Sequence, residues 1–160
     1  MVTCSHFRLK ILKILIYVLI LLNITILHGM ENLNTDLSLQ EAYSLYQNDK
    51  IKIIDIRTLN EWNMTGVIPK SILINMHDEN YLERSEFSME LKNILSKNNK
   101  NNVAIICASG ARSKIVSDYL INEGYENIYN IPDGIIGKKS DGWLFQGFPL
   151  LEYKSLKEKE

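Results

Sequence analysis

Hydrophobic and polar positions between residues 36 and 131 follow two alternating periods, one typical of helices and one typical of strands. Apolar residues at helical spacing predict helices at 36–48, 84–96 and from about Ser113 to Gly124. Short runs of branched aliphatic residues predict strands at 51–56, 72–74, 103–106 and 127–131, and we expect the first two to be buried. Alternation at this spacing predicts an α/β fold, with a mostly parallel central sheet and helices on both faces.

The predicted helices carry boundary signals and apolar stripes. Ser38 and Glu41 have the spacing of a capping box, and Gly124 is a typical helix terminator. The expected stripes are Leu39, Ala42, Leu45 and Tyr46 in the first helix, Met89, Leu91, Ile94 and Leu95 in the second, and Ile115, Val116, Tyr119 and Leu120 in the third.

The first 29 residues differ from the rest, since they contain three basic and no acidic residues. A nearly unbroken apolar run extends from Ile14 to Leu27, and as a helix it would reach about 21 Å, short of the roughly 30 Å hydrocarbon core of a bilayer. A basic start, an apolar run and the small residue Gly29 are typical of a signal peptide. We therefore expect 1–29 to be a signal peptide or, if it is retained, an N-terminal anchor.

This segment implies export of a domain at 30–152 with a solvated tail at 153–160. The chain is rich in Ile, Lys and Asn, the residues of AT-rich codons, which favours a bacterial periplasm or cell envelope. A membrane is an expected partner only if 1–29 is retained.

Charge and cysteine content exclude several classes of protein. Residues 30–160 hold 15 basic and 19 acidic side chains without a basic cluster, which argues against a nucleic-acid partner. The only cysteines are Cys4 and Cys107, too few for a disulfide framework or a four-cysteine zinc site. His77 stands beside two acidic residues in what we expect to be a solvated loop, and no metal is expected.

Cys107 directly follows the predicted strand 103–106, where parallel sheets commonly form their sites. Small residues follow it, so backbone N–H groups can converge on one point, and Gly110 permits a positive φ. Arg112 adds a guanidinium near a helix start, an environment that binds anions and activates a thiol. The alternative is that Cys107 closes the strand as a small hydrophobic side chain.

The loop Cys-x-Ser-Gly-x-Arg-Ser of residues 107–113 resembles the active-site loop of single-domain rhodaneses, the sulfurtransferases that carry sulfur as a cysteine persulfide. The resemblance covers about residues 36–151 and includes Asp55-Ile56-Arg57, Glu61-Trp62, Gly66-Val67-Ile68-Pro69, Asp133-Gly134-Ile135, Trp143, Gly147 and Pro149.

Four features of the sequence depart from the family pattern. Val67 stands where His is frequent, Lys70-Ser71 replaces Gly-Ala, and the interval from Gly134 to Trp143 is several residues longer than usual. Ala108 occupies a position where many thiosulfate-using members have Arg or Lys, which weakens the case for thiosulfate as the donor.

The resemblance implies a role for each site residue. Cys107 would be the nucleophile, Ala108, Ser109, Gly110, Ala111 and Arg112 would bind the substrate, and Ser113, Asp55 and Arg57 would support the loop. For Asp55 and Arg57 a structural ion pair is the favoured interpretation, with Arg57 and Glu61 as a second pair. Trp143 is expected in the core or a pocket wall.

The expected function is transfer of a sulfane sulfur from thiosulfate or a persulfide, through a Cys107 persulfide, to a thiol acceptor, with no further cofactor. Cysteine phosphatases and arsenate reductases are an alternative, but their Cys-x5-Arg loops are longer than Cys107 to Arg112. A non-catalytic or thiol-sensing envelope module is the other alternative.

Overall fold

The computed structural model describes residues 13–18, 35–98 and 101–154. The chain divides into two compact units, Met1–Asn34 and Thr35–Glu160. In the first unit, residues 13–18 are helical, and the rest of the predicted signal segment lies outside the described residues. The described residues include no helix with both the length and the apolar character needed to cross a bilayer.

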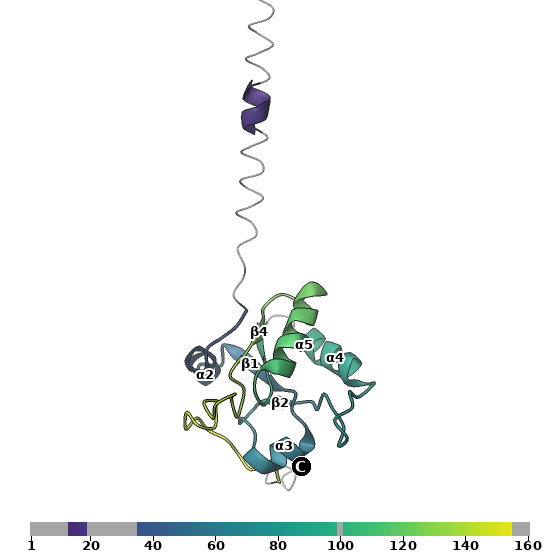
Figure 1. Cartoon of the computed structure of the whole chain (residues 1–160), viewed down its shortest axis with the longest axis vertical. Coiled ribbons are helices and arrows are strands. Elements are labelled where there is room, and N and C mark those ends of the chain that lie inside the picture. The colour runs from purple at the N-terminus through teal and green to yellow at the C-terminus, as the bar shows by residue number, and fades with distance from the viewer. Residues whose placement is uncertain (1–12, 19–34, 99–100, 155–160) are drawn as a thin grey trace, which may run out of the picture. The chain divides into compact units, whose positions relative to one another are not determined.

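Four parallel strands form one sheet in the second unit (Figure 1). The strands are β1 (Ile51–Asp55), β2 (Ile72–Leu73), β3 (Asn102–Ile106) and β4 (Ile128–Asn130), in the order β2-β1-β3-β4. The predicted parallel sheet is confirmed. Strand β3 lies between β1 and β4. The loops that follow these two neighbouring strands therefore lie on either side of the carboxyl end of β3.

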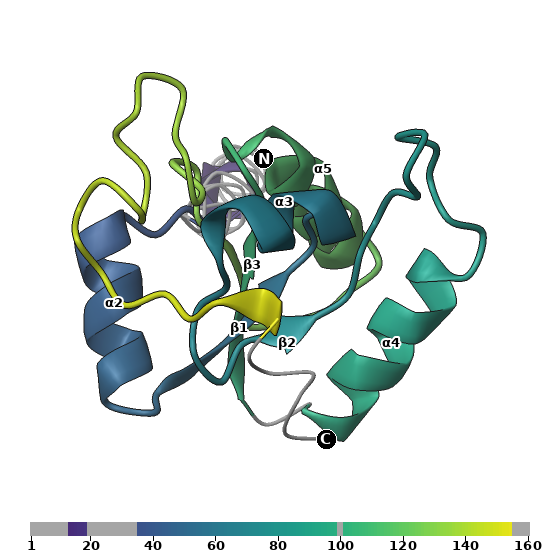
Figure 2. The same cartoon turned by 90° about the horizontal axis from the view of Figure 1, so that it is seen from below.

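The helices are α2 (Leu39–Gln47), α3 (Leu59–Thr65), α4 (Phe87–Lys97) and α5 (Ala111–Asn122). Figure 2 shows α2 and α4 on opposite sides of the sheet. Leu91, Leu95, Val116 and Leu120 of α4 and α5 pack in one core cluster, and Leu39 and Ala42 of α2 pack in the other. Helices on both faces are therefore confirmed.

Strand β3 supplies side chains to both clusters because successive residues point to opposite faces. Val103, Ile105 and Cys107 pack in the cluster of α4 and α5, whereas Ala104 and Ile106 pack in the cluster of α2. The side chain of Cys107 therefore lies on the face of the sheet that α4 and α5 cover.

Three burial predictions were wrong. Strand β2 is half-buried because it lies at the sheet edge, although we expected a buried strand. In α5 the expected stripe included Ile115 and Tyr119, which are 66% and 43% exposed, and in α4 it included the exposed Met89. The buried residues of α5 are Ser113, Val116, Ser117 and Leu120. These lie at helical spacing too, and the small serines let α5 approach the sheet closely.

Helix α3 was not predicted. Its N-cap Thr58 accepts a hydrogen bond from the Glu61 N–H, and the Glu61 carboxylate accepts one from the Thr58 N–H. This capping box has the Thr-x-x-Glu pattern and could have been recognised in the sequence. Seven residues provide too short a window for a clear helical stripe.

Candidate active site

Cys107 lies one residue beyond β3 and is only 1% exposed. The Ser113 hydroxyl oxygen lies 3.5 Å from Cys107 Sγ and 3.1 Å from the Gly110 carbonyl oxygen. It can donate its single hydrogen to either one. Because the thiol is almost fully buried, a reaction partner has to present one narrow atom to it.

Residues 107–112, which we call the Cys107 loop, carry five consecutive N–H groups, from Ala108 to Arg112. None of the five donates a hydrogen bond to an acceptor within the part of the chain that the structure describes. Gly110 has φ of 83°, and a Cβ at this residue would lie 1.8 Å from the Pro132 carbonyl oxygen. Consecutive free N–H groups in such a turn can bind an anion.

The segment that follows β4 is hydrogen-bonded to the backbone of the Cys107 loop. The Ile135 N–H donates to the Cys107 carbonyl at 2.9 Å, and the N–H groups of Ile136 and Gly137 donate to the Ala108 carbonyl at 2.8 and 3.1 Å. These bonds use the carbonyl groups of the loop. Its N–H groups are left as the donors available to a ligand.

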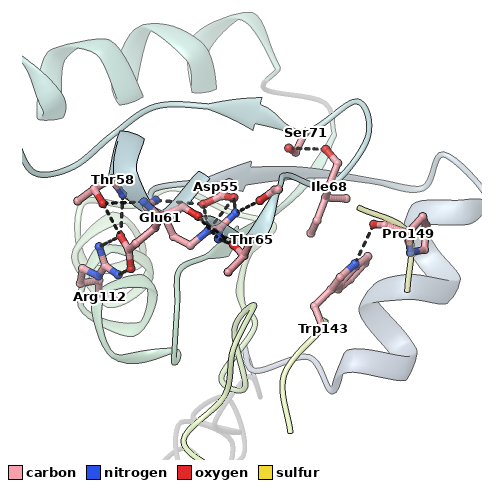
Figure 3. A network of polar contacts seen from close by, with 11 residues as sticks. Asp55, Thr58, Glu61, Thr65, Ile68, Ser71, Arg112, Trp143 and Pro149 are labelled. Atoms are coloured by element: carbon pink, nitrogen blue, oxygen red, sulfur yellow. Dashed lines mark hydrogen bonds and ion pairs between the residues drawn. The ribbon is translucent and has the colours of Figure 1, made fainter. Parts of the chain in front are cut away.

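Arg112 lies in the first turn of α5, because this helix begins at Ala111, two residues before the predicted start. Its guanidinium donates to both carboxylate oxygens of Glu61, at 2.5 and 3.0 Å. Figure 3 shows this pair beside Thr58, which also donates to Glu61 from its N–H and its hydroxyl, at 2.8 and 2.9 Å. Sequence reasoning did not assign Glu61 to the site.

Glu61 and Arg112 are both ionised at neutral pH. Burial alone would raise the pKa of Glu61, but the bonds from Arg112 and Thr58 outweigh it, and this pKa lies below its ordinary value. Burial would lower the pKa of Arg112, but the Glu61 carboxylate raises it overall. The positive charge of Arg112 is thus largely offset by Glu61 before any substrate arrives.

Asp55 and Arg57 form the predicted ion pair, and both side chains are 0% exposed. Arg57 Nε lies 3.0 Å from both carboxylate oxygens of Asp55, and Nη2 lies 2.7 Å from Oδ2. The guanidinium also donates to the Thr65 hydroxyl at 2.6 Å and to the Gly66 carbonyl at 2.7 Å. The pair therefore joins the end of β1 to the end of α3, the helix that carries Glu61.

The predicted pairing of the Arg57 and Glu61 side chains is wrong. Arg57 reaches only the backbone carbonyl of Glu61, at 3.4 Å, while the carboxylate binds Arg112. The carboxylate is held at the start of α3 by the capping box, so it lies on the Arg112 side.

Two other residues were given structural interpretations. Trp143 is fully buried and donates from Nε1 to the Pro149 carbonyl at 3.2 Å, so its assignment to the core is confirmed (Figure 3). His77 pairs with Glu83 in a short bridge, and its Nδ1 is buried with no hydrogen-bond partner within the described residues. His77 lies in a loop, as expected, but its side chain is half-buried, because residues 76–84 fold back on themselves.

We expect Glu61→Gln to lower the free energy of unfolding by about 1–3 kcal/mol at neutral pH, because it leaves Arg112 without a carboxylate partner. Glutamine can still complete the capping box, so α3 should persist. The lowered pKa of Glu61 stabilises the fold above the unfolded-state value of about 4.3, and this stabilisation is lost as pH falls through the folded-state pKa. Urea unfolding between neutral and acidic pH measures both effects.

The control for this prediction is Glu90→Gln, because Glu90 also binds an arginine, Arg84, through both carboxylate oxygens, at 3.1 Å each. That pair is more exposed, so its loss should cost less than about 1 kcal/mol. A difference between wild type and Glu61→Gln that stays constant down to acidic pH would contradict the assigned role of the carboxylate.

Comparisons with known proteins agree with this geometry. The Rhodanese-like domain family matches residues 38–139. An uncharacterised protein of Rickettsia conorii is 33% identical over 114 residues, which span 68% of this chain and 90% of that protein. The thiosulfate sulfurtransferase GlpE of Glaesserella parasuis is 22% identical over 121 residues, which span 76% and 96%. The crystal structure of a rhodanese-related protein from Thermoplasma volcanium has a TM-score of 0.55 and 27% identity, covering 73% of this chain and 97% of that one.

The matched residues contain all four strands, helices α2 to α5 and the Cys107 loop. The match extends over more than half of the chain, and the sulfurtransferase among the relatives aligns over nearly its whole length. By these similarities the chain belongs to the rhodanese-like domain family, which includes sulfurtransferases.

Proposed function

We propose that this protein is a sulfurtransferase in which Cys107 carries the sulfur as a persulfide. The Cys107 thiolate attacks the outer sulfur of a donor such as thiosulfate. A sulfur–sulfur bond forms to Cys107, the bond between the outer sulfur and the sulfonate group breaks, and sulfite leaves with the electron pair. The terminal persulfide sulfur then carries the negative charge that the thiolate held before.

The observation that carries the proposal is the set of five free N–H groups that directly follow Cys107. The added sulfur would lie about 2 Å beyond Sγ, and we expect these N–H groups to bind it. Donors already in place around a developing anion stabilise it without reorganisation. The 1% exposure of Cys107 also suits a donor that delivers a single atom better than one that delivers a tetrahedral phosphate.

The second half of the reaction needs an acceptor from outside the domain. Cys107 is the only cysteine of residues 30–160, so the persulfide has no internal thiol to resolve it. A thiolate of another molecule would attack the terminal sulfur and leave with it, which returns Cys107 to the thiolate form. Under this proposal the protein is one step of a relay between a sulfur donor and a thiol acceptor.

The test is the intact mass of the reduced protein after incubation with thiosulfate. We expect a gain of one sulfur atom that a reductant reverses, and no gain in Cys107→Ser, because the hydroxyl is a far weaker nucleophile. The matched control is Cys4→Ser, which removes the other cysteine of the chain and should load like wild type. Thermal unfolding of Cys107→Ser should match wild type, since the exchange changes little volume.

Sulfur loading of Cys107→Ser would contradict the proposed function. So would a wild-type protein that takes no sulfur from thiosulfate or from an organic sulfane donor, and this result would favour a thiol-sensing module. Hydrolysis of a phosphate ester that depends on Cys107 would favour phosphatase chemistry instead.

A further inference from the structure

The positive charges near the Cys107 loop differ in how far they are already neutralised. Arg112 is paired with Glu61, and Lys114 is paired with Asp118. Lys138 and Lys139 are exposed, and within the described residues neither ammonium group has an ion pair or a hydrogen bond. These two lysines are therefore the available cations of the segment that holds the Cys107 loop.

Lys138 and Lys139 lie in a short loop, residues 137–142, that projects after β4 (Figure 2, yellow-green). Its two ends touch, because the Gly142 N–H donates to the Ile136 carbonyl at 3.1 Å, and a Cβ on Gly142 would lie 2.6 Å from the Gly137 nitrogen. Gly137 is itself bonded to the Ala108 carbonyl. Lys138 thus begins one residue away from a direct contact with the Cys107 loop.

Acidic residues of the same segment oppose this charge only in part. Asp141 accepts a hydrogen bond from the Lys139 backbone N–H at 3.3 Å, which keeps its short side chain within the loop. Asp133 also has a short side chain, whereas each lysine has a flexible four-carbon stem that can follow an incoming anion. Because Coulomb attraction grows as distance falls, the groups that can move toward the anion dominate.

We propose that Lys138 and Lys139 recruit anionic sulfur donors to Cys107 and thereby set the preference of the protein for doubly charged donors. The proposal rests on the proposed function and names its donor class. Ala108 supplies no charge, and Arg112 is paired with Glu61. The loop of residues 137–142 therefore supplies the positive charge that the Cys107 loop lacks. The two lysines act on the approach of the donor, and the chemical step at Cys107 does not depend on them.

The experiment compares three donors that deliver an outer sulfur in the same way but differ in charge. Thiosulfate is a dianion, methanethiosulfonate a monoanion, and 2-aminoethanethiosulfonate a zwitterion without net charge. We expect Lys138→Gln/Lys139→Gln to lower kcat/KM for thiosulfate by about threefold to tenfold at low salt, through electrostatic steering. The loss should be smaller for the monoanion, absent for the zwitterion, and should fade at about 1 M salt, where the Debye length is about 3 Å.

The matched control is Lys50→Gln/Lys97→Gln. These two exposed lysines lie just before β1 and at the end of α4. Both positions are near the amino ends of the strands, whereas Cys107 follows the carboxyl end of β3. This variant changes net charge by the same amount and should leave all three values of kcat/KM unaltered. Lys138→Glu/Lys139→Glu should reduce thiosulfate use further than the glutamine variant does.

An equal loss with all three donors would overturn the proposal, because the lysines would then act through loop conformation. Unchanged thiosulfate kinetics in both Lys138 and Lys139 variants would overturn it as well, while leaving the proposed function intact. If wild type takes sulfur from none of the three donors, the proposed function fails and the donor preference fails with it.

Discussion

Replacing Asp55 with Asn is expected to lower the free energy of unfolding by about 3–5 kcal/mol, a large part of the stability of a domain of this size. The substitution leaves the guanidinium of Arg57 buried without a countercharge, and both side chains are 0% exposed. Asparagine can accept only part of the bonds that the carboxylate accepts from Arg57 Nε, Nη2 and the backbone N–H. Urea unfolding followed by circular dichroism measures the loss.

Asp118→Asn is the control for this prediction. It is the same chemical change in an ion pair with Lys114 whose side chains are 46% and 47% exposed. Pairs of this kind contribute about 0.5 kcal/mol or less. Similar losses in the two variants would mean that burial of the Asp55–Arg57 pair does not control its contribution.

Gly110→Ala is expected to reduce sulfur loading by about a hundredfold, the effect of displacing a reacting group by about 1 Å. The added Cβ would lie 1.8 Å from the Pro132 carbonyl oxygen, so the Cys107 loop or its neighbour has to shift. The residue also has φ of 83°, a conformation that adds about 1–2 kcal/mol of strain for alanine. Loading is measured by intact mass over time, and stability by thermal unfolding.

Gly124→Ala separates the two contributions, because Gly124 has φ of 88° with no atom within 4 Å of an added Cβ. This variant should lose about 1–2 kcal/mol of stability and keep its sulfur loading. If Gly110→Ala loads at the wild-type rate, the geometry of the Cys107 loop is not what makes Cys107 reactive.

The sheet could be predicted because its strands are coded locally. Short aliphatic runs such as Ile51–Ile56 have few alternatives to burial between helices, and the helices between them force parallel pairing. Burial within α5 could not be predicted in the same way. Ile115 is more hydrophobic than Ser113 and Ser117, yet the serines are buried because the helix packs closely on the sheet. The distance between α5 and the sheet determines which face of α5 is buried, and the hydrophobicity of the sequence does not reveal that distance.

The residues of the site also differ in whether the sequence alone could identify them. The Cys107 loop is contiguous, so Cys107, Gly110 and Arg112 could be proposed as a unit from their order alone. The partner of Arg112 could not be identified, because Glu61 lies 51 residues away in sequence and meets Arg112 only when α3 and α5 pack. Its local role in the capping box was readable, but its role as a countercharge depends on the fold.

The hydrogen bonds from Ile135, Ile136 and Gly137 to the Cys107 loop also have a consequence for the order of synthesis. A growing chain contains β1, β3 and Cys107 well before it contains the donors that hold the carbonyl groups of Cys107 and Ala108. At about 5–20 residues per second, this interval lasts on the order of seconds. During that time the nascent chain carries its thiol in an unanchored loop, and the site is completed only after Gly137 has been added and has reached the sheet.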